Sequence, residues 1–287
     1  MPVSESIGKD LNGCSQCQQR HSCIVANLLT PKALDRFPGF SRHEAIYIRK
    51  QRVFSQDAEF STCYIVKTGS VKAVSVDSKG NEKIVGFYLP GDIFGWEGIH
   101  KGQLPCSAVA MERSTVCKIP LDHLEQVALS RPDFLHSMLK LMSRELNTVE
   151  TLAVLLTRYT AEERVVAFLL EMSQRFAERG LSANSFRLPM NRTDMGNYLG
   201  LAVETVSRIL GRIQQRGDII LRGKEVRILK PERLHGIFDR SDEPGSDCHE
   251  EAGGVFHPIF PEQHKNPPFR TRRSETNRGA LKALRLV

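Results

Sequence analysis

The cysteines are the residues of this chain whose types and spacing most clearly suggest chemistry. Cys14, Cys17 and Cys23 follow a Cys-x2-Cys-x5-Cys spacing near the N-terminus, and Cys117, in the segment STVCKIP, is a candidate for a fourth ligand. Four thiolates around one small volume can hold a zinc ion or an iron–sulfur cluster, and their number alone does not separate the two. The sequence therefore predicts a metal centre. Because three ligands come from one short segment, the folding of that segment should depend on occupancy of the centre.

The other cysteines have weaker claims as ligands. Cys106 lies eleven residues before Cys117 and could replace it. Cys63, in STCYIV, alternates with its neighbours as a core residue does, so we expect an inert buried thiol. The C-terminal part holds four more residues of metal-binding type, whose irregular spacing in a polar segment argues against a site. These residues are Cys248, His249, His257 and His264.

Composition is typical of a globular protein with room for two domains. The chain has 287 residues, of which 40% are hydrophobic and 25% charged. No apolar run approaches the roughly 20 residues that span a bilayer, and the N-terminus lacks the layout of a signal peptide. We therefore expect no membrane association and a cytoplasmic location. Cysteines are normally reduced there, so the Cys-x2-Cys motif favours metal or redox chemistry over a disulfide framework.

Positive charge is concentrated in one part of the chain. The formal net charge is +7, which is compatible with nucleic acid but is weak evidence alone. Residues 201–240 carry nine Lys or Arg against five acidic residues, whereas residues 241–287 carry seven of each. The basic excess therefore lies just before a balanced tail. Because that tail is rich in Pro, Gly and charge and has few aliphatic residues, we expect it to be disordered.

The segment that must position Cys117 is predicted to be rich in β-structure. Residues 45–120 contain short runs of β-branched and alternating apolar residues, separated by turn sequences at residues 77–80 and 90–92. This pattern favours an antiparallel sandwich or roll.

A helical pattern replaces the β pattern at Asp133. Apolar residues then recur at alternating steps of four and three, which is the spacing of a heptad seam. The seam residues are Leu135, Leu139, Met142, Leu146, Val149, Ala153 and Leu156. A helix packed on its own domain remains an alternative, but the length and regularity of the pattern favour a seam between two copies of the chain. We therefore predict a homodimer.

The basic region has the pattern of a helix-turn-helix. Residues 161–176 form an amphipathic helix, and residues 192–216 read as two helices broken at Gly200. One side of the second helix carries apolar residues and the other carries polar and basic residues. The apolar residues are Val206, Leu210 and Ile213, and the polar ones are Glu204, Ser207, Arg208 and Arg212. The following GDIILRGKEVRIL predicts a two-stranded wing around residues 222–224.

A β-roll, a long helix and a winged helix-turn-helix, in that order, resemble the Crp/Fnr family of bacterial transcription regulators over residues 10–238. The cysteine spacing, STVCKIP, TAEERVVAFL, RTDMGNYLGL and VETVSRILGR resemble its Fnr branch, which senses oxygen through a [4Fe-4S] cluster. The resemblance implies an α+β chain with a cyclic-nucleotide-binding-like roll. Its parts would be a cysteine segment at 1–30, the roll at 31–132, a dimerisation helix at 133–160, the winged helix-turn-helix at 161–238 and a tail at 239–287.

The resemblance also implies roles for individual residues. The cluster ligands would be Cys14, Cys17, Cys23 and Cys117, so that the resemblance favours Cys117 over Cys106 and a [4Fe-4S] cluster over zinc. The operator would be an inverted repeat of TTGAT-like half-sites in promoters of anaerobic metabolism. RNA polymerase would be a partner, with the hairpin at residues 81–86 as one candidate contact.

The predicted recognition helix has the chemistry to read DNA. Glu204, Ser207 and Arg208 lie at i, i+3 and i+4 near its start. Arg208 can donate two hydrogen bonds to a guanine, and Glu204 can accept one from a cytosine amine. Ala202 stands where Ser or Thr usually caps such a helix, and a missing cap costs ~1 kcal/mol. Packing of Leu201 and the turn must therefore fix the helix start.

Other classes fit the sequence less well. A cyclic-nucleotide pocket needs an acid for the ribose and an arginine for the phosphate, but Glu97 is displaced by one position and residues 105–108 contain no arginine. His21 and Cys63 leave a haem-dependent regulator open, although no haem attachment motif is present. An iron–sulfur redox protein is disfavoured, because the chain has no ferredoxin run, no nucleotide-binding glycine motif and no catalytic constellation. We therefore expect a regulator and not an enzyme.

Overall fold

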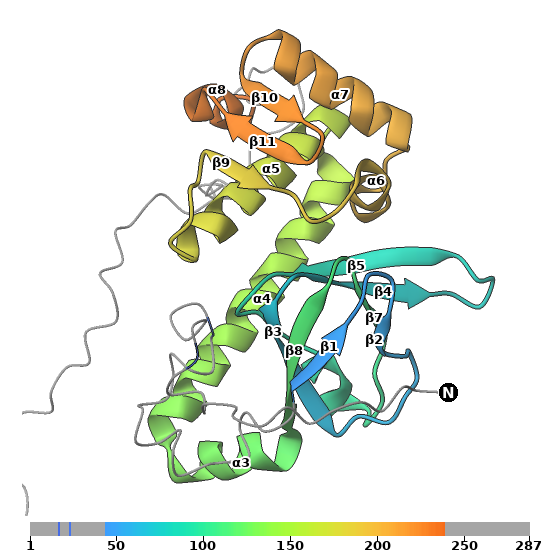
Figure 1. Cartoon of the computed structure of the whole chain (residues 1–287), viewed down its shortest axis with the longest axis vertical. Helices are drawn as coiled ribbons and strands as arrows, with labels where there is room; N and C mark the ends of the chain where they lie inside the picture. Colours follow the sequence, from blue (N-terminus) through green and yellow to red (C-terminus); the bar gives the residue numbers. More distant parts are fainter. Residues whose placement is uncertain (1–16, 18–22, 24–43, 239–287) are drawn as a thin grey trace, which may run out of the picture. The chain divides into compact units, whose positions relative to one another are not determined.

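The structure is a computed structural model that describes Cys17, Cys23 and residues 44–238 (Figure 1). The predicted ligand Cys14, His21, most of the predicted cysteine segment and the tail with Cys248 and its neighbouring histidines lie outside these residues. In the part of the chain that is described, no helix combines the length and the apolar character needed to cross a membrane.

The β-rich segment forms two antiparallel sheets of four strands each. The first has the order β1-β8-β3-β6 and the second the order β2-β7-β4-β5. Their strands are β1 (Glu44–Tyr47), β2 (Arg52–Phe54), β3 (Thr62–Thr68), β4 (Val71–Val76), β5 (Glu82–Tyr88), β6 (Ile93–Phe94), β7 (Ser107–Ala110) and β8 (Ser114–Pro120). A short 3-10 helix, η3 (Trp96–His100), follows β6. The predicted roll is confirmed.

The two predicted turns are closed by aspartates. In the β4–β5 hairpin, Asp77 Oδ1 accepts hydrogen bonds from the backbone N–H groups of Lys79 (2.8 Å) and Asn81 (2.9 Å). After β5, Gly91 adopts a φ of 96°, and Asp92 Oδ2 accepts from the Leu89 N–H at 2.8 Å. Short polar side chains that bond to nearby backbone are the reason such sequences form turns.

The core of the roll extends onto two helices. Buried side chains of β3 and β8, such as Ile65 and Ile119, form one cluster with Leu124 of α3 (Leu121–Ser130) and Phe134 of α4 (Pro132–Arg158). Helix α4 begins with a proline at its first position, where the missing N–H has no helical partner in any case. The roll therefore anchors the start of the long helix. The sequence predicted this helix at 133–160, close to the observed bounds, and did not predict α3.

The C-terminal part is a winged helix-turn-helix. Helix α5 (Ala161–Glu178) begins with a capping box formed by Thr160 and Glu163. It is followed by β9 (Ser185–Arg187), α6 (Arg192–Leu199), α7 (Val203–Gln215), β10 (Ile219–Arg222), β11 (Glu225–Ile228) and α8 (Pro231–His235). The sheet has the order β10-β11-β9. The prediction of a two-stranded wing missed β9, because three residues with one buried apolar side chain, Phe186, give almost no strand signal.

Candidate nucleic-acid interface and metal centre

The turn between α6 and α7 is fixed by glycines. Gly200 ends α6 with a φ of 66°, a left-handed conformation that side chains with a Cβ disfavour. Within α6, a Cβ on Gly196 would lie 2.6 Å from the Leu201 carbonyl oxygen, so only glycine fits there. The Leu201 N–H donates to the Gly196 carbonyl at 2.8 Å. The predicted break at Gly200 is therefore confirmed, and it is a tight turn that holds the two helices together.

Helix α7 presents the two faces that its sequence predicted. Val206, Leu210 and Ile213 are buried, and Ile209 joins them. Glu204 and Arg208 are exposed, and Ser207 is half-buried. As expected, Ala202 provides no side-chain cap. Glu204 lies in the first turn of α7, where its negative charge interacts favourably with the positive end of the helix dipole.

Arg212 differs from the other predicted DNA-binding residues. Its Nη2 atom lies 3.5 Å from Glu162 of α5, and the same carboxylate binds Arg216 at 2.5 Å. Glu204 and Arg208, in contrast, form no ion pair with another residue that the structure describes. Arg212 and Arg216 therefore link α7 to α5. Sequence analysis did not predict this link, because it depends on how α5 and α7 pack against each other.

The predicted dimer seam lies on the exposed side of α4. Five of its seven side chains, from Leu135 to Val149, are between 41% and 62% exposed. Ala153 is also exposed, and Leu156 is half-buried. The residues of α4 that pack inside the chain are Phe134, Leu141 and Leu155, which lie on another side. An apolar stripe of this length that one copy leaves uncovered is the pattern of a helix-pairing surface.

Cys117 lies on β8 between β1 and β3. It is opposite Glu44 on one side and Ile65 on the other, and it is half-buried. Cys23 and Cys117 both pack against the same core cluster, the one that contains Ile65 and Ile119. β8 is an inner strand of the first sheet, and its neighbour β1 is the outermost strand.

Lys67 of β3 connects this region to Cys17. Its ammonium group lies 2.6 Å from Glu44. Burial lowers the pKa of Lys67, but the Glu44 carboxylate and the thiols of Cys17 and Cys117 together outweigh it, so that the pKa is raised. Cys17 and Cys117 therefore both lie within electrostatic reach of one cation.

Cys63 and Cys106 lie in a different environment. They are 1% and 6% exposed, and burial, with the charge of Glu97, raises the pKa of each thiol to about 12. The prediction that Cys63 is a buried thiol is confirmed. Among the residues that the structure describes, no three His, Cys, Asp or Glu side chains are grouped to hold a metal ion. Cys14, the remaining predicted ligand, lies outside the described residues.

Two residues in the segments that the sequence analysis compared with a cyclic-nucleotide pocket have hydrogen-bond partners within the protein. Glu97 accepts a hydrogen bond from the Tyr88 hydroxyl at 3.1 Å. Ser107 Oγ accepts one from the Gln56 N–H at 2.9 Å, and Cys106 beside it is buried.

Comparison with known proteins agrees with this architecture. Residues 46–131 match the cyclic nucleotide-binding domain, and residues 163–237 match the Crp-like helix-turn-helix domain. The chain is 38% identical to the transcriptional activator protein FnrA of Stutzerimonas stutzeri over 216 residues, which cover 75% of this chain and 88% of that protein. The chain belongs to the Crp/Fnr family. It is also 37% identical to the fumarate and nitrate reduction regulatory protein of Escherichia coli K12, over 75% of this chain and 86% of that one.

A solved structure has a similar fold. FixK2 from Bradyrhizobium japonicum matches with a TM-score of 0.61 and 33% identity, covering 68% of this chain and 96% of FixK2. The predicted family and fold are confirmed. Because its relatives are transcription regulators, this Crp/Fnr chain is a DNA-binding transcription regulator and not an enzyme.

Proposed function

We propose that this Crp/Fnr protein is an oxygen-responsive regulator of anaerobic metabolism genes that acts in the cytoplasm. In this proposal Cys14, Cys17, Cys23 and Cys117 hold a [4Fe-4S] cluster, and the protein with its cluster binds as a homodimer to an inverted repeat of TTGAT-like half-sites. Two observations support the proposal: Cys17 and Cys117 both act electrostatically on Lys67, and Cys23 and Cys117 pack against the same core cluster.

The residues present fit such a cluster. Thiolates are the ligands that iron–sulfur clusters require, and a [4Fe-4S] cluster with four thiolates carries net negative charge. Lys67 supplies a cation within electrostatic reach of Cys17 and Cys117, where it would offset part of the negative charge of such a cluster. When bound, the cluster would supply a reaction with oxygen that ends with its loss. The chain would then lose the ligand-held order of its N-terminal segment.

The thiols of Cys63 and Cys106 do not fit. Each is buried beside the carboxylate of Glu97, and both conditions oppose loss of the thiol proton. This is the structural support for Cys117 over Cys106 as the fourth ligand.

DNA reading is proposed to reside in Glu204, Ser207 and Arg208, with Arg212 in a supporting position. Arg208 is exposed and has no ion pair with another described residue, so its guanidinium is available to a guanine. Arg208→Ala should lose about 1 to 3 kcal/mol of discrimination at one guanine of each half-site. Titration of the variant with single-base operator variants measures this loss. Equal weakening on every sequence would mark Arg208 as a phosphate contact instead.

The homodimer is proposed to pair through the exposed stripe of α4. All seven seam residues are apolar, whereas the family often places a charge in this seam, so part of the dimer should persist without the cluster. Val149→Asp would bury like charges against each other and should make dimerisation depend on the cluster. Sedimentation of cluster-free wild type and variant at equal concentration tests this. A wild type that is fully monomeric without its cluster at micromolar concentration would contradict it.

RNA polymerase remains a proposed partner, and contacts within the chain bear on which part of the hairpin could reach it. In the hairpin at residues 81–86, the backbone of Glu82 and Ile84 and the side chain of Lys83 already contact α6. The exposed turn of this hairpin, residues 77–81, is therefore the better candidate for a polymerase contact.

A further inference from the structure

Strand β5 is bonded to the first helix of the helix-turn-helix through one side chain. Asn197 of α6 accepts a hydrogen bond from the Ile84 N–H at 2.6 Å and donates one to the Glu82 carbonyl at 2.8 Å. β5 is the outermost strand of its sheet, so these backbone groups have no neighbouring strand on that side. The Asn197 amide occupies the place of a strand residue. Lys83, between the two bonded residues, also donates to the carbonyls of Asn197 and Tyr198.

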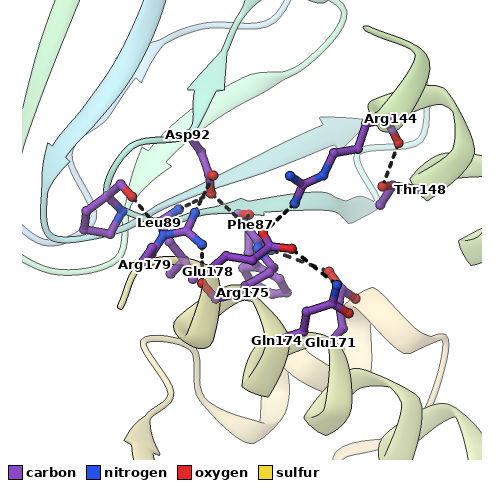
Figure 2. A network of polar contacts seen from close by, with 11 residues as sticks. Phe87, Leu89, Asp92, Arg144, Thr148, Glu171, Gln174, Arg175, Glu178 and Arg179 are labelled. Carbon is purple, nitrogen blue, oxygen red and sulfur yellow. Dashed lines mark hydrogen bonds and ion pairs between the residues drawn. The ribbon is translucent and has the colours of Figure 1, made fainter. Parts of the chain in front are cut away.

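The end of β5 is bonded to the helix before it, α5. Arg175 Nη2 donates to Asp92 Oδ2 at 2.6 Å and to the Phe87 carbonyl at 2.7 Å, as Figure 2 shows. Arg179 forms a second ion pair with Asp92 and donates to the Pro90 carbonyl. The two arginine side chains are only 18% and 10% exposed, so these ion pairs are shielded from water. Ion pairs of this kind fix geometry better than exposed pairs do.

An aromatic contact joins the two attachments. The ring of Phe87 lies 5.1 Å from that of Tyr198 of α6 and 6.1 Å from that of Phe168 of α5, and the latter two rings are 5.9 Å apart. All three are buried. Because buried rings pack without voids, a rotation of α6 on the roll would open a gap here.

Movement of α6 would be passed on to the recognition helix. The turn at Gly196 and Leu201 leaves no room between α6 and the start of α7, and Glu162 binds the other end of α7 through Arg216. In this arrangement Glu204 and Arg208 stay exposed. The contacts of β5 thus hold α7 in place without covering its DNA-reading face.

We propose that β5 positions the helix-turn-helix, with Asn197 as the positioning residue, and so sets the spacing of half-sites that the dimer accepts. Two recognition helices at a fixed separation bind only half-sites at the matching separation along the duplex. A helix-turn-helix released from β5 can tilt and accept other spacings, at a cost in affinity for the best one. The inference rests on the proposed function as an operator-binding dimer.

The test uses the full-length protein, prepared without oxygen, and a series of inverted repeats whose half-sites are moved apart or together by one or two base pairs. Asn197→Ala removes both bonds to β5. We expect its affinity for the best-spaced operator to fall about tenfold, since each lost hydrogen bond weakens binding several-fold, and the preference for that spacing to shrink by a similar factor. Lys83→Met, on the roll side, should shift the preference in the same direction.

Two comparisons separate positioning from a general loss of structure. Val85→Ala alters an exposed residue of β5 next to the Asn197 contact and should leave the spacing preference unchanged. Asn197→Asp keeps the acceptor for the Ile84 N–H, so it should retain part of the spacing preference that Asn197→Ala loses. Iron content of all variants should equal that of the wild type, and unfolding temperatures should fall by no more than the few degrees that two lost hydrogen bonds cost. A wild type that binds the repeats no better than scrambled DNA would overturn the proposed function and this inference with it. A wild-type preference that Asn197→Ala and Lys83→Met both retain in full would overturn this inference alone.

Discussion

Two pairs of thiols in this chain have opposite surroundings. Cys17 and Cys117 lie within electrostatic reach of the Lys67 ammonium, and Cys117 is half-buried on β8, between β1 and β3. Cys63 and Cys106 are buried in the interior beside the Glu97 carboxylate, where the pKa of each rises to about 12. A thiolate is the form that binds iron, and a nearby cation favours it whereas burial beside a carboxylate opposes it. Burial beside Glu97 therefore argues against Cys63 and Cys106 as ligands of the proposed cluster.

The largest expected effect separates Cys117 from Cys106. Cys117→Ser should lose nearly all of the iron and acid-labile sulfide of the anaerobically purified protein, because a fourth thiolate is removed from the cluster. Cys106→Ser, its matched control, should keep both. Iron and sulfide analysis, with absorption spectra, measures the difference. Full content in Cys117→Ser together with loss in Cys106→Ser would reverse the assignment of the fourth ligand.

Alkylation rates should sharpen the same comparison. At pH 8 a thiol with a pKa of 9.0 is about one tenth thiolate, and one with a pKa of about 12 is ~1,000-fold less so. In the folded protein, iodoacetamide should therefore modify Cys63 and Cys106 at least about 1,000-fold more slowly than in denaturant. Mass spectrometry of the labelled peptides gives the rates. Equal rates for Cys106 in the folded and denatured protein would show that it is not buried.

The smallest expected effect is on alkaline stability. The pKa values of Cys63 and Cys106 are raised on folding, so their contribution to stability is complete below pH 9 and is lost as the pH rises toward 12. Between pH 9 and 10, each thiol should cost about 1 kcal/mol of the free energy of unfolding. Denaturant unfolding over this range should show a shallower slope with pH in Cys63→Ala than in wild type. An identical slope would contradict the raised pKa of Cys63.

Short-range sequence patterns predicted several features of this structure. The heptad spacing from Leu135 to Leu156 predicted both the long helix and its exposed stripe, because side-chain spacing alone sets which residues share a helix face. Gly200 marked the turn before the recognition helix, because the left-handed backbone at that point favours glycine over residues with a Cβ. The turn residues after β5 were likewise visible in the sequence.

Contacts between distant segments could not be predicted in this way. Asn197 bonds to a strand residue 113 positions away, and no local pattern marks one amide as such a partner. Arg175 and Arg179 look like surface charges on an amphipathic helix until the turn at Asp92 is placed beside them. The pairing of Arg212 with Glu162 also depends on how α5 packs on α7. For the cysteines, spacing suggested Cys14, Cys17 and Cys23, and only the family resemblance favoured Cys117 over Cys106; this assignment stays a prediction.

Operator binding with and without oxygen tests the central claim most directly. Anaerobic wild-type protein should bind an inverted TTGAT-like repeat specifically, and exposure to air should lower that affinity as the iron–sulfur absorption is lost. Anaerobic Cys117→Ser should bind as weakly as air-exposed wild type and should not respond to oxygen, while Cys106→Ser should behave as wild type. Specific binding by Cys117→Ser at the anaerobic wild-type level, or a wild type whose affinity does not change in air, would contradict control of DNA binding through the cysteine cluster.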